Sequence, residues 1–387
     1  MPNTLTNLTP TIYEALDIVS REQIGYIAAA SRDVAAERAA LNQSILVPIT
    51  PPPTLANNVA AVSAPDTGDQ TIGNVSMAIT KSRHAPIRWN GEEQRGLLNA
   101  GSYNGILLNQ FVQAFRALGN EMEVDLHNAA YRNSSRAVGL AGTAPFGTAG
   151  DLADIANVRR VLDDNGAPQS DLKIVLGSAA IANLRGKQSV LFKVNESGTE
   201  SLLREGVIGR LEGFDVHNSL APVVHTKGTG ASYVTSGATA PGVSSIALVT
   251  GTNTVLAGDT VTFAADAVNR YVVQTGVAAP GTIVLGAPGA LVTIPTANAL
   301  TVGNNYTPNM AFSKSALMLI ARPPAMPIGP DGRAMDMADD TMLVTDPVTG
   351  ITFEIAVYRQ FMQLVYHVRL AWGAQAIKPN HIATLMG

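Results

Sequence analysis

The stretch that decides the fold is residues 102–132, SYNGILLNQFVQAFRALGNEMEVDLHNAAYR. Its apolar residues recur at intervals of three or four, which places them on one face of an α-helix. They are Leu107, Phe111, Phe115, Leu118, Met122, Leu126 and Ala129. Roughly 31 residues at 1.5 Å each span about 46 Å, far more than an average globular helix. The sequence therefore predicts one long helix that serves as the spine of a large molecule.

Charged residues are sparse throughout the chain. The 387 residues include 26 Lys and Arg and 30 Asp and Glu, so only 14% are charged. A typical soluble chain carries about 25%. A compact monomer of 40.4 kDa exposes on the order of 14,500 Å², and a surface that faces only water normally carries more charge. The deficit indicates that other protein covers much of the surface.

The same composition excludes several classes of function. A net charge of −4 argues against binding nucleic acid through overall electrostatics. The absence of cysteine excludes disulfides, thiolate catalysis and cysteine-based metal sites. We expect no membrane span, because Gly, Ser, Thr and Asn interrupt every apolar run. We also expect no secretory signal, because the first 20 residues contain no Lys or Arg.

The chain before the long helix divides into two expected segments. Residues 1–50 are predicted to form an N-terminal arm, because Thr11 and Glu14 fit a capping box. Both a partner-binding arm and an ordinary surface helix fit its apolar positions, Ile12, Leu16, Val19, Ile24 and Ile27. Residues 51–91 begin with three prolines and contain two alternating runs, so we predict a long extended two-stranded loop. The runs are Thr71–Ile79 and His84–Trp89.

The rest of the chain predicts an α+β fold with an inserted all-β barrel or sandwich. Residues 139–222 alternate helical and strand patterns, which return over residues 314–387. A strand is expected over Phe361–Trp372. Between these parts, residues 223–313 consist of short β-rich runs separated by Gly, Pro and Asn. The 86 residues of 228–313 contain only three charged side chains, Asp259, Asp266 and Arg270.

No linear motif of catalysis or ligand binding is present. The sequence lacks a P-loop, a zinc-protease helix, a nucleophile elbow and an EF-hand. We interpret the acidic cluster Asp331, Asp336, Asp339 and Asp340 as a solvated loop and not as a cation site. We therefore predict no catalytic residue, no cofactor and no metal, and expect that the protein is not an enzyme.

Four strings, in this order, resemble the major capsid proteins of tailed bacteriophages, which have the Hong Kong 97 fold. They are Leu162–Pro168 (LDDNGAP) followed by Lys173–Ser178 (KIVLGS), then Gly206–Val216 (GVIGRLEGFDV), and last Arg369–Pro379 (RLAWGAQAIKP). The inserted β region is similar to the insertion in the branch typified by the coat protein of the short-tailed Salmonella phage. The order of arm, loop, spine helix and α/β unit also resembles this family.

The resemblance implies a structural role in a virion. It implies a peripheral domain over 92–138 with the spine helix, an axial domain over 139–222 and 314–335, and peripheral or axial strands over 336–387. The chain would assemble with itself into hexamers and pentamers of an icosahedral shell, with T=7 expected, in the bacterial host cytoplasm. Scaffolding protein and portal protein would be partners, with a cementing or decoration protein as a further candidate. Double-stranded DNA would be packaged inside without sequence-specific binding.

Contacts between subunits are expected along the loop and the spine helix. The candidates are Lys81, Arg83, Arg88, Trp89, Arg116 and Glu121. For Lys81, both a carboxylate on a neighbour and plain solvation fit the sequence. Two other functions also fit the sequence as a whole. One is the shell of an encapsulin-like compartment, and the other is a β-rich surface or carbohydrate-binding protein.

Overall fold

The computed structural model describes most of the chain. The described residues are 9–22, 25–34, 37–50, 53–55, 57–58, 60, 68–99, 103–188, 209–330 and 335–387. Some of the expectations concern residues outside these described ranges. They are Ile24, Asp331 and residues 206–208 of the Gly206–Val216 string. The described part is α+β, as expected.

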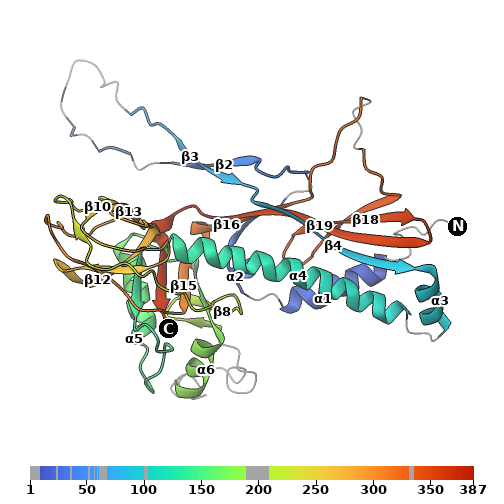
Figure 1. Cartoon of the computed structure of the whole chain (residues 1–387), viewed down its shortest axis with the longest axis horizontal. Helices are drawn as coiled ribbons and strands as arrows, with labels where there is room; N and C mark the ends of the chain where they lie inside the picture. The colour runs from blue at the N-terminus through green and yellow to red at the C-terminus, as the bar shows by residue number, and fades with distance from the viewer. Residues whose placement is uncertain are drawn as a thin grey trace.

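The spine helix is confirmed as α4, Tyr103–Arg132. Six of the seven apolar positions that predict it are buried, and Ala129 is half-buried. The face that they form packs against a six-stranded sheet, where the Phe111 ring lies 5.7 Å from that of Tyr366 and the Phe115 ring 5.0 Å from that of Phe353. Figure 1 shows α4 running along one side of this sheet.

The six-stranded sheet joins segments from both ends of the chain. Its order is β1-β16-β19-β18-β17, with β4 on the other side of β19. The strands are β1 (Ser31–Val34), β4 (Lys81–Asn90), β16 (Leu317–Arg322), β17 (Asp340–Thr345), β18 (Thr352–Gln360) and β19 (Gln363–Ala376). The expected strand Phe361–Trp372 begins two residues late, because Phe361 and Met362 form the exposed turn between β18 and β19.

The prediction of a two-stranded loop over 51–91 is wrong, because its two runs do not pair with each other. Its second run belongs to β4, which pairs along its whole length with β19 and buries Ile87 and Trp89. The two-stranded element is instead formed by β2 (Ser44–Ile49) and β3 (Gly73–Ala78). It therefore begins inside the segment predicted as the arm. In Figure 1 this hairpin stands away from the body, on the side of the sheet opposite α4.

The N-terminal helix packs within its own chain. Helix α1 (Thr9–Glu22) lies against α4 and buries Ile12, Leu16 and Val19. A short helix α2 (Tyr26–Ala29) and strand β1 follow it. Of the two interpretations of this segment, the structure shows the packed helix. Helix α3 (Gly91–Asn99) connects β4 to α4.

A second sheet forms the α/β unit. Its strands are β5 (Arg136–Gly139), β6 (Leu172–Leu176), β7 (Arg210–Leu211), β8 (Phe214–Asn218), β15 (Pro308–Ser313) and β20 (Ile382–Met386), in the order β7-β8-β6-β15-β20-β5. Helices α5 (Ala153–Asp164) and α6 (Ser178–Lys187) contribute to its core, in which Leu162, Ile174 and Leu184 are fully buried. Two short 3₁₀ turns, Lys314–Ala316 and Pro379–His381, precede β16 and β20.

The all-β insertion is present and has its own core. It contains β9 (Val234–Thr235), β10 (Ser245–Val249), β11 (Thr260–Phe263), β12 (Asp266–Thr275), β13 (Gly281–Leu285) and β14 (Leu300–Val302). Tyr233, Phe263 and Ile283 are at the centre of its core.

Two features of the insertion differ from the expectation. Residues 308–313, predicted as its last part, form β15, which is fully buried between β6 and β20. The insertion is also not a closed unit, because β12 pairs with β5 and extends the second sheet to 12 strands. Backbone hydrogen bonds therefore join the insertion to the α/β unit.

The central position of α4 predicts a large penalty for truncating its buried face. Phe111→Ala should lower the free energy of unfolding by about 3–5 kcal/mol, because a fully buried ring is lost and a cavity remains. Val124→Ala on the exposed side of the same helix should change it by less than about 0.5 kcal/mol. Denaturant unfolding measures both, and equal effects of the two substitutions would contradict this account of the core.

Candidate functional site

The predicted contact residues Lys81 and Glu121 meet within one chain. The Lys81 ammonium lies 2.8 Å from Glu121 Oε1 and 2.8 Å from Asp125 Oδ1. Trp372 Nε1 donates to the other Asp125 oxygen at 2.9 Å. Partial burial alone lowers the pKa of Lys81, but the hydrogen bonds to the two carboxylates outweigh it and raise the pKa. The cluster fastens β4 and β19 to α4.

Asp125 was not among the predicted residues, although its position one helical turn after Glu121 was a usable signal.

The other predicted residues of β4 lie in two different environments. Arg83 is 60% exposed and lies 3.5 Å from the Glu121 carboxylate. Arg88 is exposed and forms no hydrogen bond or ion pair with any residue that the structure describes. Trp89 is buried against α4, and its Nε1 donates to Gln110 Oε1 at 2.9 Å. The arginines are therefore available to a neighbour, whereas the Trp89 ring is part of the core.

A buried carboxylate on α4 holds two distant segments. Glu123 Oε1 accepts the Ile27 N–H at 2.7 Å, and Oε2 accepts the Tyr26 N–H at 2.9 Å and the Ser219 hydroxyl at 2.8 Å. Burial raises the pKa of Glu123, although the three hydrogen bonds oppose the rise. The carboxylate thus connects α4 to the start of α2 and to the chain after β8.

The space around this carboxylate has no room for a side chain at Gly25. A Cβ there would lie 2.5 Å from Glu123 Oε2 and 2.8 Å from Ser219 Cβ. A cavity of about 550 Å³ opens beside the carboxylate and is lined by Arg116 among others. Arg116, a predicted contact residue, thus lies at the junction of α1, α4 and the α/β unit.

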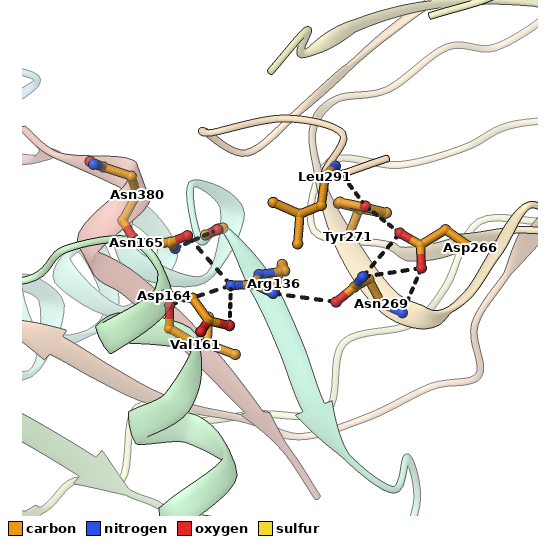
Figure 2. Close-up of polar contacts among 10 residues, drawn as sticks. Arg136, Val161, Asp164, Asn165, Asp266, Asn269, Tyr271, Leu291 and Asn380 are labelled. Atoms are coloured by element: carbon orange, nitrogen blue, oxygen red, sulfur yellow. Dashed lines mark hydrogen bonds and ion pairs between the residues drawn. The ribbon is translucent and has the colours of Figure 1, made fainter. Parts of the chain in front are cut away.

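The insertion is joined to the α/β unit through a buried arginine (Figure 2). Arg136 on β5 donates to Asn269 Oδ1 of the insertion at 3.3 Å. Its other terminal nitrogen donates to Asp164 Oδ2 at 3.2 Å and Asn165 Oδ1 at 3.4 Å, at the end of α5. The Asn165 amide donates in turn to the carbonyl of Asn380 at 2.7 Å. One guanidinium therefore connects the insertion, α5 and, through Asn165, the C-terminal segment.

The polar network continues inside the insertion. Asp266 accepts the Tyr271 hydroxyl at 2.5 Å and the Asn269 side-chain amide at 3.0 Å. The Tyr271 oxygen accepts the Leu291 N–H at 3.0 Å. Burial, together with the Asp266 carboxylate, raises the pKa of Tyr271, so the hydroxyl stays protonated as a donor. The turn that carries Asn269 is thereby fixed in place for Arg136.

All three charges of residues 228–313 are turned inward. Asp259 is fully buried and accepts His225 Nε2 at 2.8 Å. Asp266 is the buried acceptor just described, and Arg270 donates to the carbonyl of Gly139. The outer surface of this segment therefore consists of apolar, hydroxyl and amide groups.

A row of rings runs from the N-terminal segment through α4 to the insertion. The Tyr26 hydroxyl and His127 Nδ1 are 2.8 Å apart. The ring centroids of His127 and Tyr131 are 5.2 Å apart, those of Tyr131 and His225 5.6 Å, and those of His225 and Tyr306 5.5 Å. Burial, with a smaller effect of nearby positive charge, lowers the pKa of His127 to about 3. His127 is therefore neutral at physiological pH.

Among the described residues, no group of three or more His, Cys, Asp or Glu is placed to hold a metal ion. In the acidic cluster, Asp336 pairs with Arg369 at 2.8 Å and Asp339 with Arg359 at 2.7 Å. Within the described ranges, no helix is long and apolar enough to cross a membrane.

Comparison with known proteins gives matches only among solved structures. No protein-family model matches the chain, and no curated protein matches it. The capsid of cyanophage P-SCSP1u is 11% identical, with a TM-score of 0.47 over 94% of this chain and 88% of that one. A structure from Mycobacterium phage Ogopogo is 12% identical, with a TM-score of 0.46 over 94% of this chain and 92% of that one.

A third similar structure is a virus-like particle from Pyrococcus furiosus. It is 9% identical, with a TM-score of 0.44 over 97% of this chain and 98% of that one. These values are too low to assign the chain to a family.

Removing the Arg136 guanidinium should loosen the insertion. Arg136→Met keeps the apolar stem but leaves Asn269 and Asn165 without this donor, so the free energy of unfolding should fall by about 1–3 kcal/mol. Amide exchange should accelerate where β5 pairs with β12. Arg160→Met changes an exposed position of α5. It should alter the free energy of unfolding by less than about 0.5 kcal/mol and leave amide exchange at β5 and β12 at the wild-type rate. Unchanged exchange at β5–β12 in Arg136→Met would contradict the role of Arg136.

The lowered pKa of His127 predicts a loss of stability in acid. The unfolded chain binds this proton near pH 6.5, whereas the folded chain binds it only near pH 3, so stability falls as the pH drops between these values. His127→Asn keeps an acceptor for the Tyr26 hydroxyl. It should reduce the dependence of the unfolding free energy on pH by up to about 1.4 kcal/mol per pH unit. Gln113→Asn, at an exposed position of the same helix that carries no titratable group, is the control, and an unchanged slope in His127→Asn would refute the prediction.

Proposed function

We propose that this chain is a shell-forming virion protein, the major capsid protein of a tailed phage with the Hong Kong 97 fold. In this proposal, α1, α4 and the six-stranded sheet form the peripheral domain. Strand β16 of this sheet lies within 314–335, which was predicted as axial, so the proposal moves it to the peripheral domain. The α/β unit forms the axial domain, and the all-β region is its insertion. The shell is icosahedral and is built from hexamers and pentamers of the chain.

The observation that carries the proposal is the weakly charged surface of the chain and the large apolar side chains exposed on it. Only 14% of its residues are charged. A surface this poor in charge suits a subunit whose faces are covered by neighbours.

The β2–β3 hairpin carries the clearest set of these exposed apolar side chains. It stands away from the body in Figure 1 and exposes Leu46, Leu55 and Ile72, at 60%, 92% and 64%. Large apolar side chains at such exposure mark a contact surface when they lie on one projecting element. We propose that the hairpin lies over a neighbouring subunit in the shell. The predicted contact residues Arg83 and Arg88 are exposed on β4, the strand that follows the hairpin.

The remaining parts of the proposal concern partners and location. Scaffolding protein and portal protein are the proposed partners, and a cementing or decoration protein is a further candidate. The packaged double-stranded DNA is enclosed without sequence-specific binding, in keeping with the net charge of −4. Assembly is proposed to take place in the bacterial host cytoplasm, and the mature location is the virion. No catalytic role is proposed.

Electron microscopy of the expressed chain tests the proposal. The wild-type protein, with its scaffolding protein where one is needed, should form closed shells. Leu46→Asp should reduce the assembled fraction at least about tenfold, because it places a charge in a contact surface. Its monomer should unfold at the wild-type temperature, since this side chain is exposed in the free chain. A wild-type chain that stays monomeric under all conditions would contradict the proposed function.

A further inference from the structure

The β2–β3 hairpin joins the body through two short stretches of chain. After β3, the Thr80 N–H donates to the carbonyl of Trp372 at 3.0 Å, and β4 then pairs along its whole length with β19. Before β2, residues 37–43 belong to no strand of the sheet. The stretch after the hairpin is therefore fixed by strand pairing, whereas the stretch before it needs another anchor.

The backbone attaches the stretch before β2 to the body at one bridge among the described residues. The Ala39 N–H donates to the carbonyl of Pro323 at 2.9 Å, and the Ala39 carbonyl accepts the Ala325 N–H at 2.9 Å. Apolar side chains of the hairpin, Met77 among them, share a small core with Ala39. Apolar contacts have no preferred direction, so this core keeps the hairpin close to the body without fixing its angle.

Arg38 supplies a directional anchor at the same place. Its Nη2 lies 2.5 Å from Glu354 Oε1, and its Nη1 donates to the carbonyl of Pro324 at 2.9 Å. A guanidinium is planar with donors at fixed angles, so two contacts from one group set a direction as well as a distance. The neighbouring Glu37 also pairs with Arg322, at 3.2 Å, but its side chain is 86% exposed and water screens this pair.

Glu354 is placed for this contact by the alternation of β18. Its neighbours Phe353 and Ile355 face the core beside α4, so Glu354 points to the opposite face of the sheet, where the hairpin stands. The Glu354 side chain is fully buried, and its Oε2 accepts no hydrogen bond from a described residue. A buried carboxylate strongly favours keeping a charged donor. The hydrogen bond from Arg38 to Oε1 is therefore hard to give up.

A second arginine near Glu354 is held in place from its other side. Arg369 Nη1 lies 3.7 Å from Glu354 Oε2, beyond hydrogen-bond distance. Arg369 Nη2 donates to Asp336 Oδ2 at 2.8 Å, and the guanidinium lies over the ring of Tyr358 at 5.2 Å. Arg369 thus contributes positive charge beside the carboxylate but does not replace Arg38 as the donor.

We propose that Glu354 is a positioning residue that sets the direction of the β2–β3 hairpin through Arg38. This inference rests on the proposed function, in which the hairpin lies over a neighbouring subunit. A hairpin held in one direction before contact reduces the ordering entropy that assembly must overcome. Glu354 thereby favours assembly from inside the subunit, because its fully buried side chain is out of reach of a neighbour.

The distance between two spin labels tests this role in the unassembled chain. The sequence contains no cysteine, so Asn74→Cys on β3 and Ala117→Cys on α4, both at exposed positions, are the only two attachment sites. Pulsed electron paramagnetic resonance of the dilute monomer measures the distribution of label-to-label distances. Arg38→Met should broaden this distribution at least about twofold, because the hairpin then keeps only its bridge and its non-directional contacts.

Three further variants make the test specific. Glu354→Gln removes the charge at the other end of the same contact and should broaden the distribution to a similar extent. Arg38→Lys keeps a charged donor and should give an intermediate width. Arg359→Met is the matched control, because Arg359 lies on the same strand but pairs with Asp339, at 2.7 Å, and not with residues 37–43. It should keep the wild-type width.

Assembly of the unlabelled chains provides the functional readout. Arg38→Met and Glu354→Gln should each raise the protein concentration needed for shells by at least about threefold, because a mobile hairpin must be ordered on contact. Arg359→Met should assemble at the wild-type concentration. Light scattering and electron microscopy measure this threshold, and thermal unfolding of each monomer measures the stability of its fold.

The outcomes separate this inference from the proposed function. If the ion pair only stabilises the fold, Arg38→Met will unfold at a lower temperature but keep the wild-type width of distances. The positioning role of Glu354 is then wrong, while the shell function stands. Equal broadening in Arg359→Met would also overturn it, because the effect would not depend on the contact with Arg38. Failure of the wild type to form shells would instead contradict the proposed function.

Discussion

The burial of one face of α4 is the constraint on which the rest of the structure depends. Its apolar side chains are covered by β4, β18 and β19 on one side and by α1 on another. A helix of 30 residues cannot bury so long a face in a round domain, so the covering elements are long as well. The 14-residue strand β19 and the 10-residue strand β4 follow from this requirement. The elongated shape of the body is the consequence.

Polar groups along α4 and just beyond its C-terminal end fix what surrounds it. Near its middle, Glu121, Glu123 and Asp125 hold β4, α2 and β19 by hydrogen bonds and ion pairs. Beyond its C-terminal end, Arg136 on the next strand fixes the insertion against α5. Each of these groups joins elements that are distant in the sequence. Together they explain how three hydrophobic cores are held in one molecule.

The sequence was sufficient where the signal is local. The period of Leu107 to Leu126 is complete within one segment, so α4 could be predicted almost to the residue. The low charge and short β-rich runs of 228–313 likewise sufficed to predict the insertion. The pairing of His84–Trp89 could not be predicted, because its partner β19 lies near the other end of the chain and leaves no local mark. Residues 308–313 were assigned to the insertion by mistake. A strand that is buried on both faces shows no alternating pattern, so its sequence does not indicate whether it belongs to the insertion or to the α/β unit. Arg136 belongs to no motif, and its partners come together only in the fold.

The central claim is that neighbouring copies complete the surface of this chain. A cryo-electron microscopy map of particles formed by the wild-type chain measures this most directly, as the area that each subunit buries against its neighbours. The account predicts more than about 2,000 Å² per subunit, including the β2–β3 hairpin, as in permanent assemblies. Contacts that bury less than about 800 Å² in total, the size of incidental packing, would contradict it.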